Sequence, residues 1–154
     1  MLVYRKEDLS VYYFIKSVFS SYPLLNVVDS FPSTAVENSE LIIPTVSIDA
    51  GKLVEEDFEI GNRNKIRVRT WYIDIFAKNK SQRDDMGYSM LAAANNGINI
   101  YDYDEGFPPD VSPTRIGHMQ ILSQSYEPIP VILSENEKSY FRGQIIFVTE
   151  NDTV

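Results

Sequence analysis

The sequence contains no cysteine and a single histidine, His118. Disulfide scaffolds, thiolate zinc sites and cysteine nucleophiles are therefore excluded. A metal site built from histidine and cysteine cannot be assembled from this inventory either. The absence of cysteine also fits a reducing compartment such as the cytoplasm.

Basic residues are scarce as well. Lysine and arginine number 14 against 22 aspartates and glutamates, which gives a formal net charge of −8. A sequence-independent grip on DNA or RNA needs clustered positive charge that displaces counterions from the phosphates. The nearest approach to a basic patch is a set of residues that we expect on one strand: Arg63, Lys65, Arg67 and Arg69. Ordinary nucleic-acid binding is therefore not expected.

Long apolar runs are missing too. The N-terminal segment contains an apolar stretch, but Lys16 interrupts it, charged residues precede it, and no small-residue cleavage site follows. The stretch is too short to span a bilayer. We expect a soluble, unprocessed intracellular chain that does not bind a membrane.

The residues that are present describe an ordinary globular protein. The chain has 154 residues, of which 44% are hydrophobic and 23% charged. This length and this mix are typical of a single domain with one core, so we expect one domain over residues 1–154. Aromatic residues reach 12%. Because tyrosine joins a large apolar ring to a hydroxyl that can stay hydrated, this surplus indicates extensive packing or an interface.

Apolar spacing predicts two amphipathic helices. The first is expected over residues 8–20, with acids in its first turn and Pro23 behind its end. The second is expected over residues 82–95, where the Asn-Asn-Gly sequence supplies a stop. Its apolar face consists of Met86, Gly87, Met90, Leu91 and Ala94.

The first strands carry irregularities. The sequence leaves open whether Val27 and Val28 form a short strand. Residues 41–50 are typical of a strand, in which Pro44 indicates an edge position or a bulge. Residues 54–77 predict a hairpin around a polar, glycine-containing loop. The apolar set in its second arm changes parity at Thr70, which predicts a bulge or a bend there.

Three further strands are expected at residues 98–103, 118–126 and 139–148, with a proline-rich loop over 104–115. The order of helices and strands predicts an α+β fold. In this fold, two main helices pack on an antiparallel or mixed sheet of about five to seven strands.

Asp84 and Asp85 could in principle form an acid–base pair. Ser81 stands three residues before Asp84, where the helical pattern begins. Its hydroxyl can accept from the backbone N–H of Asp84, whose carboxylate can reach back in return, and acids are favoured at this end of a helix. We therefore interpret Ser81 and Asp84 as a structural helix cap.

Two further candidates for chemistry remain. Asp102, Asp104 and Glu105 could bind Ca²⁺ or Mg²⁺, but the other oxygen ligands of a calcium loop are missing. His118 is not accompanied by a nucleophile-elbow motif, and the glycines form no phosphate-binding loop. We expect no catalysis, no cofactor and no metal. An enzyme would have to rely on Asp102, Asp104 and His118.

The basic stripe ending in Arg67 and Arg69 has two open interpretations. It could be a solvated strand face that discourages edge pairing. It could also be an electrostatic interface with an acidic surface of another copy or of a partner. On the second interpretation, changing Arg67 and Arg69 to glutamate should block assembly and leave the fold intact.

Four segments in this order carry a resemblance: RVRTWYIDIFAKN, SQRDDMGYSMLAAANNG, INIYDYDEG and YFRGQIIFV. The chain resembles the tail terminator, or tail-completion, proteins at the neck of tailed bacteriophages. The resemblance covers roughly residues 41 to 149, and the N-terminal helix also fits.

The resemblance implies a structural virion protein without enzymatic activity. Copies would assemble, in the bacterial host cytoplasm, into a ring that is typically a hexamer. The ring caps the tail tube, ends its polymerisation and joins the tail to head-completion proteins around the DNA channel. DNA would pass through without specific binding, as a net charge of −8 favours. Charge and loop character suggest these interface residues: Arg67, Arg69, Trp71, Phe107, Pro108 and Pro109.

Other functions stay open beside this one. Another head–tail connector or collar protein would share the setting. A small non-viral adaptor module that binds a protein partner belongs to a different class.

Overall fold

The structure, a computed structural model, describes residues 1–22, 25–29, 32, 42–57, 65–130 and 141–151. Two helices and six strands follow one another along these ranges. They are α1 (Val3–Val18), β1 (Asn26–Val28), β2 (Thr45–Asp57), β3 (Lys65–Ala77), α3 (Lys80–Ala94), β4 (Ile98–Asp102), β5 (Thr114–Ile129) and β6 (Phe141–Asn151).

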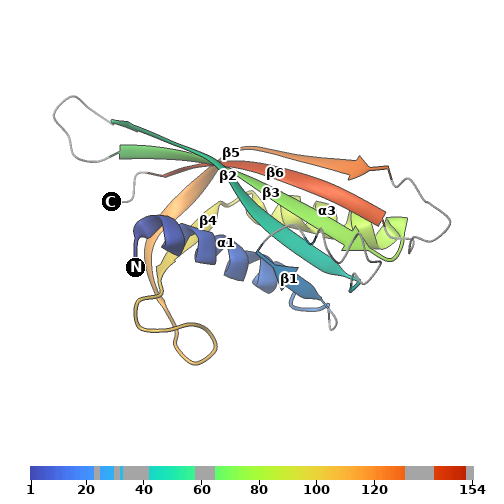
Figure 1. Cartoon of the computed structure of the whole chain (residues 1–154), viewed down its shortest axis with the longest axis horizontal. Coiled ribbons are helices and arrows are strands. Elements are labelled where there is room, and N and C mark those ends of the chain that lie inside the picture. Colours follow the sequence, from blue (N-terminus) through green and yellow to red (C-terminus); the bar gives the residue numbers. More distant parts are fainter. Residues whose placement is uncertain (23–24, 30–31, 33–41, 58–64, 131–140, 152–154) are drawn as a thin grey trace.

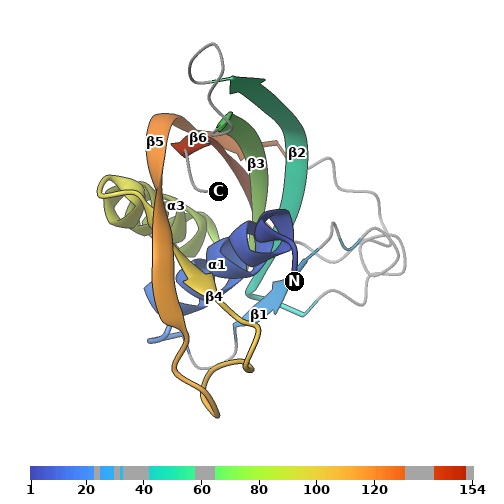
Figure 2. The same ribbon diagram turned by 90° about the vertical axis from the view of Figure 1, so that its left-hand side faces the viewer.

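The six strands form one mixed sheet in the order β1-β2-β3-β6-β5-β4. The β1–β2 pair is parallel, and every other pair is antiparallel. The sheet curves into a half-barrel around α1 (Figures 1 and 2), while α3 packs against β3, β5 and β6. The predicted α+β fold with two helices on a mixed sheet is confirmed.

The core fills the hollow of this sheet. The central strand β3 contributes Trp71, Ile73, Ile75 and Ala77, and its neighbour β6 contributes Ile145 and Phe147. The helices add Val11, Ile15 and Phe19 from α1 and Met86, Met90 and Ala94 from α3. Each large side chain among them is fully buried, a burial that stabilises a fold by about 1.5–3 kcal/mol per side chain.

Helix α1 begins at Val3, earlier than the predicted residue 8, and ends at Val18. The extra turn contains Lys6 and Glu7, which are both buried. Because charged residues occupy these inward positions, the helical spacing of apolar residues does not extend to the true start of the helix.

The predicted cap of the second helix is wrong. Helix α3 begins at Lys80, and Asn79 is its N-cap. The Oδ1 atom of Asn79 accepts from the backbone N–H of Gln82 at 2.8 Å, and Oε1 of Gln82 accepts from the N–H of Lys78 at 2.9 Å. An asparagine two residues before Ser81 therefore takes the capping role, for which asparagine ranks among the best residues.

The Asp84 carboxylate belongs to the packing of α3 on the sheet instead. It accepts from the Tyr126 hydroxyl of β5 at 2.7 Å and from Nε of Arg83 at 3.0 Å. The hydrogen bond from Tyr126 is the main reason that the pKa of Asp84 is lowered. Asp84 thus serves the fold as a contact between helix and strand, whereas Asp85 is exposed.

The bulge or bend predicted at Thr70 does not lie in β3 itself. Its pairing with β6 runs without interruption from Arg67–Asn151 to Ala77–Phe141. Arg67, Arg69 and Trp71 consequently point to the same, inner face of the sheet, because side chains alternate along a strand.

The irregularity lies at the expected level but in the neighbouring strands. In β2, Gly51 and Lys52 stand together opposite Thr70. In β5, Leu122 is an extra residue beside Val148, the partner of Thr70 in β6. The paired residues Thr70 and Val148 are therefore flanked by a bulge in β2 on one side and a bulge in β5 on the other. Bulges increase the twist and bending of a strand.

The strand predicted at residues 41–50 and the first arm of the hairpin predicted from residue 54 form one continuous strand, β2. The remaining strand predictions hold with shifted ends. Val27 and Val28 do form a short strand, and β4 and β6 lie where strands were expected. Pro44 precedes β2 and lies outside it. The hairpin of β2 and β3 is confirmed, but its glycine-containing loop, with Arg63, lies outside the described residues. The acidic sequence SENEK at residues 134–138, which we expect to join the last two strands, lies outside them as well. No helix in the described ranges is long and apolar enough to cross a membrane.

Candidate functional site

Arg67 and Arg69 do not form a surface stripe. The two residues are only 4% and 6% exposed. Nε of Arg67 donates to Oε1 of Glu7 at 2.9 Å, and Nη1 of Arg69 donates to Oε2 of the same carboxylate at 3.0 Å. Glu7, which comes from α1, is 0% exposed. The interpretation of these arginines as a solvated strand face is therefore wrong.

Two further residues complete this buried ionic cluster. The Asn151 amide of β6 accepts from Nη2 of Arg67 at 2.8 Å and donates to Glu7 Oε1 at 3.2 Å. Nη2 of Arg69 donates to Oδ1 of Asp8 at 2.8 Å. We call Glu7, Asp8, Arg67, Arg69 and Asn151 the Glu7 cluster. It ties α1 to the two central strands of the sheet.

Ion pairs and hydrogen bonds offset much of the cost of burying the charges of this cluster, and Nε of Arg69 is its one buried donor without a hydrogen-bond partner among the described residues. Removing ions from water is costly unless good geometry and additional hydrogen bonds compensate. Each Glu7 oxygen accepts from an arginine, and the Arg69 guanidinium lies 4.3 Å from the centre of the Trp71 ring. Such cation–π contacts add to stability when the cation and the ring are removed from water. The arrangement is therefore a structural clamp within one chain.

Trp71 is likewise an interior residue. Its side chain is almost fully buried, and its indole N–H donates to Oγ1 of Thr149 at 3.0 Å. Three of the six expected interface residues thus face the inside of the molecule. Their expected role as a surface displayed to a neighbour is not supported by their positions in this chain.

The acidic cluster after β4 has a partner in α1. Nζ of Lys6 lies 2.9 Å from Oδ1 of Asp102 and 2.9 Å from Oδ2 of Asp104. The Lys6 ammonium lowers the pKa of Asp104 to about 2, and the hydrogen bond to Asp104 raises the pKa of Lys6. Within the part of the chain that the structure describes, no group of three or more metal-ligating side chains is present.

His118 pairs with an amide. It lies opposite Asn99 in the β4–β5 ladder, and its Nδ1 is 2.8 Å from Oδ1 of Asn99. An asparagine oxygen can orient the ring, but it is not the carboxylate that a catalytic triad uses. The position of His118 is thus that of a cross-strand neighbour in a half-buried pair.

The proline-rich loop presents the other half of the expected interface. Phe107 is 45% exposed and stacks on Tyr103 at 6.0 Å, which in turn stacks on Tyr13 of α1 at 5.5 Å. Pro109 is exposed, whereas Pro108 is partly buried and lines a pocket of about 360 Å³ with Tyr13 and Tyr103. The aromatic stack therefore holds Phe107 and Pro109 at the surface.

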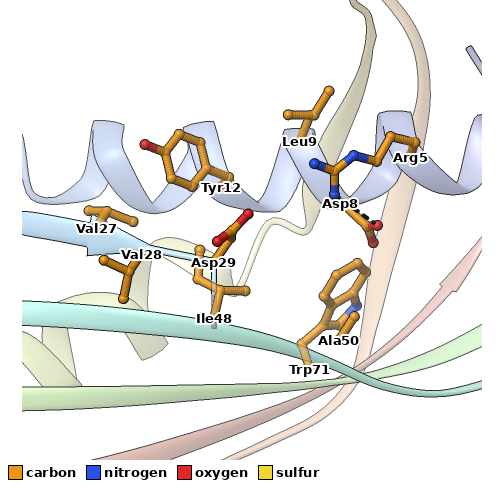
Figure 3. A pocket seen from close by; sticks show the side chains of 10 residues that line it. All are labelled: Arg5, Asp8, Leu9, Tyr12, Val27, Val28, Asp29, Ile48, Ala50 and Trp71. Carbon is orange, nitrogen blue, oxygen red and sulfur yellow. Dashed lines mark ion pairs between the residues drawn. The ribbon is translucent and has the colours of Figure 1, made fainter. Parts of the chain in front are cut away.

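A second, larger pocket lies between α1 and the β1–β2 edge (Figure 3). Its volume is about 450 Å³, and it is lined by Arg5, Asp8, Leu9, Tyr12, Val27, Val28, Asp29, Ile48, Ala50 and Trp71. Arg5 forms an ion pair with Asp8 at 3.7 Å, and the Asp29 carboxylate points into the space between α1 and the sheet. The mixture of aromatic and acidic groups can accommodate an apolar stem with a positive end.

The sheet is open along parts of both edges. The parallel strand β1 covers only residues 45–47 of β2, and β4 covers only the beginning of β5 up to Met119. Among the described residues, no strand pairs with the outer side of β2 beyond Ser47 or of β5 beyond Met119. Backbone N–H and C=O groups at such edges are available to another chain.

Sequence reasoning missed these edges because they depend on how far the short outer strands extend. A signal is present in hindsight: residues 120–126 of β5 contain no charged residue and no proline. No protein-family model matches the chain, and no curated protein sequence matches it. The surfaces just described are therefore the observations that bear on its function.

Proposed function

We propose that the chain is a structural protein of the phage neck that assembles head to tail into a ring. The ring would cap the tail tube, end tail polymerisation and join the tail to head-completion or collar proteins around the DNA channel. The observation that carries this proposal is one sheet with two different open edges, on β2 and on β5.

Two unlike edges favour a ring over a symmetric pair. In a head-to-tail contact, one surface of a copy meets a different surface of the next, and the series closes when the rotation allows it. A two-fold dimer needs only one self-complementary surface, so it would leave the other edge free. A ring, which we expect to be a hexamer, would use both.

The charge of the chain supports a channel that DNA crosses without binding. The net charge is −8, and the buried arginines of β3 are already paired with acids of α1. A duplex therefore meets little available positive charge and is not held on its phosphates.

The phage setting rests on the sequence resemblance. In that setting, the exposed loop residues Phe107 and Pro109, with Pro108 behind them, would contact the tail tube protein or a head-completion protein. Aromatic side chains are enriched at such contacts because they bury a large area. The protein would reside in the virion after assembly in the bacterial cytoplasm, with no cofactor and no catalytic step.

A second candidate function is a monomeric adaptor that binds a protein partner. The observation that favours it is the pocket of about 450 Å³ beside α1, with Tyr12 and Asp29 at its wall. Such a pocket could receive a lysine or arginine side chain of a partner. An adaptor would leave both sheet edges unoccupied.

Native mass measurement and electron microscopy of the purified full chain would test the proposal. We expect closed rings, either for the chain alone or after addition of tail tube protein. A chain that stays monomeric at high concentration and beside tail tube protein would overturn it. A gene position between those of head-completion and tail-tube proteins would be an independent check.

A further inference from the structure

We infer that residues 48–54 of β2 in one copy pair, antiparallel, with residues 120–126 of β5 in the next copy. The two half-barrels would then share one continuous sheet. This inference rests on the proposed ring, and it names the surfaces through which neighbouring copies meet.

The two open runs stand at the same level of the sheet. Ile48 pairs with Ile73, Ile73 with Ile145, and Ile145 with Tyr126. At the other end, Val54 pairs with Val68, Val68 with Glu150, and Glu150 with Gln120. Copies related by a rotation about a ring axis keep the same height when the strands run along that axis. Equal levels therefore let the runs meet without an axial shift.

The bulges of the two runs coincide as well. Gly51 and Lys52 lie beside Thr70 in β3, and Leu122 lies beside its partner Val148 in β6. Both edges therefore bend at one row. When one edge is placed against the other in this arrangement, the two bends meet, which a straight strand on either side would not allow.

Strand direction fits the same contact. Strand β2 is antiparallel to β3, β3 to β6, and β6 to β5, so β2 and β5 run in opposite directions. Rotation about an axis along the strands leaves these directions unchanged. The β2 edge of one copy therefore approaches the β5 edge of the next in an antiparallel sense, which continues the alternation of the central sheet.

The inner-face side chains of β2 in one copy and of β5 in the next would also match in polarity. Ile48 and Leu53 lie on the inner face of the sheet, as do Ile121 and Tyr126. At equal levels, Ile48 comes beside Tyr126 and Leu53 beside Ile121. Apolar and aromatic cross-strand pairs of this kind stabilise antiparallel sheets.

The β5 run lacks the usual protection of a free edge. Natural edge strands carry charges or proline that prevent pairing with other chains. Residues 120–126 have neither, and Leu122 is 52% exposed. Pro128, which lacks an N–H, lies outside residues 120–126. It is level with Val46 of β2, which already pairs with Val27 of β1 in the same chain. An edge left uncharged over this length fits a strand that becomes covered.

Cysteine cross-linking tests this pairing, because the natural chain contributes no cysteine. Asp49 and Ser125 lie at the same level on the outer face, joined in the sheet through Tyr72 and Ile146. We would make Asp49→Cys and Ser125→Cys as separate proteins, mix them and oxidise them mildly. Ala50→Cys mixed with Ser125→Cys is the matched control, because neighbouring residues point to opposite faces. Thermal unfolding of each reduced variant would confirm that it folds.

The expected result is a covalent dimer only in the Asp49→Cys and Ser125→Cys mixture, formed at least about tenfold faster than in the control, since a disulfide needs close Cβ atoms. The double variant should give a ladder of covalent oligomers that ends at the ring size. Rings without this cross-link would overturn the pairing and leave the proposed function standing. Cross-linking of Ser125→Cys with itself would overturn the pairing in favour of a two-fold contact, and a persistent monomer would overturn both proposals.

Discussion

Oε1 of Glu7 lies 2.9 Å from Nε of Arg67, although 60 residues separate the two in the sequence. The other oxygen of the same carboxylate accepts from Arg69. One fully buried acid of α1 therefore pairs with two arginines of the central strand, and Asp8 supplies the second negative charge. Because the sheet curves around this helix, the contact fixes where α1 lies in the half-barrel and hence the curvature of the sheet.

Changing Glu7→Gln should destabilise the protein by about 3–5 kcal/mol, since it leaves two buried arginines without their shared carboxylate. The free energy of unfolding from urea denaturation would measure this loss. Glu105→Gln is a matched control at an exposed loop position and should change stability by less than about 0.5 kcal/mol. Equal effects of the two changes would contradict the assignment of the Glu7 cluster as a clamp.

The double change of Arg67 and Arg69 to glutamate should prevent folding, in contrast to the expectation from the sequence. It would place two more carboxylates beside Glu7 in the interior, where an unpaired charge is severely unfavourable. Circular dichroism of the purified variant would report the loss of structure.

A compensated variant separates charge from shape in the same place. Replacing Glu7 by leucine together with both arginines by methionine should restore a folded chain, because apolar residues of similar volume often replace a buried ion cluster with little loss. A folded glutamate variant beside an unfolded compensated one would overturn this account of the cluster.

The sequence predicts the fold class because hydrophobic alternation and helical spacing survive in most elements. It fails at Arg67 and Arg69, where charged residues occupy inward positions. If every charged residue is assigned to the outer face, the inward residues before Thr70 and those after it alternate out of step. A bulge or a bend at Thr70 is then needed to explain the sequence. The partners that reverse this assignment, Glu7 and Asp8, lie on a helix far away in the sequence, so no local pattern reveals them.

The open edges are hidden from the sequence for a related reason. Whether β5 is covered depends on where β4 stops pairing, at Met119, and that is decided by tertiary packing. The exposed loop residues Phe107 and Pro109 could be anticipated, because proline and glycine mark a surface loop. Trp71 could not be placed from composition, since tryptophan serves both cores and interfaces.

Asn79→Ala should destabilise the protein by about 1 kcal/mol, since it removes the side chain that accepts from the first turn of α3. Ser81→Ala is the comparison, because the exposed Ser81 lies inside the helix, where alanine is the better helix former, and should leave stability equal or slightly higher. Urea denaturation of both variants would decide between the two caps. A larger loss for Ser81→Ala would return the cap to the serine.

Gly51→Ala should destabilise the protein by about 1–3 kcal/mol, because the new methyl group would lie 2.6 Å from Cε2 of Tyr72. Adding Tyr72→Ser should recover part of the loss by removing the ring. Thermal unfolding of the single and double variants would measure this coupling. Purely additive effects would show that the bulge of β2 does not depend on the ring.

The ion pair of Lys6 with Asp104 should make stability fall in acid. The pKa of Asp104 is lowered to about 2 in the folded chain by the Lys6 ammonium, whereas an unfolded aspartate has a pKa of about 3.9. The stabilising contribution is therefore complete above about pH 4 and is lost as pH falls toward about 2. Comparing urea denaturation of the wild type and Asp104→Asn should show their difference shrink over this range. Asp110→Asn, at an exposed loop position, is the control, because it removes one carboxylate without touching the ion pair of Lys6. A gap between wild type and Asp104→Asn that is unchanged from pH 6 to pH 2 would contradict this role of the ion pair.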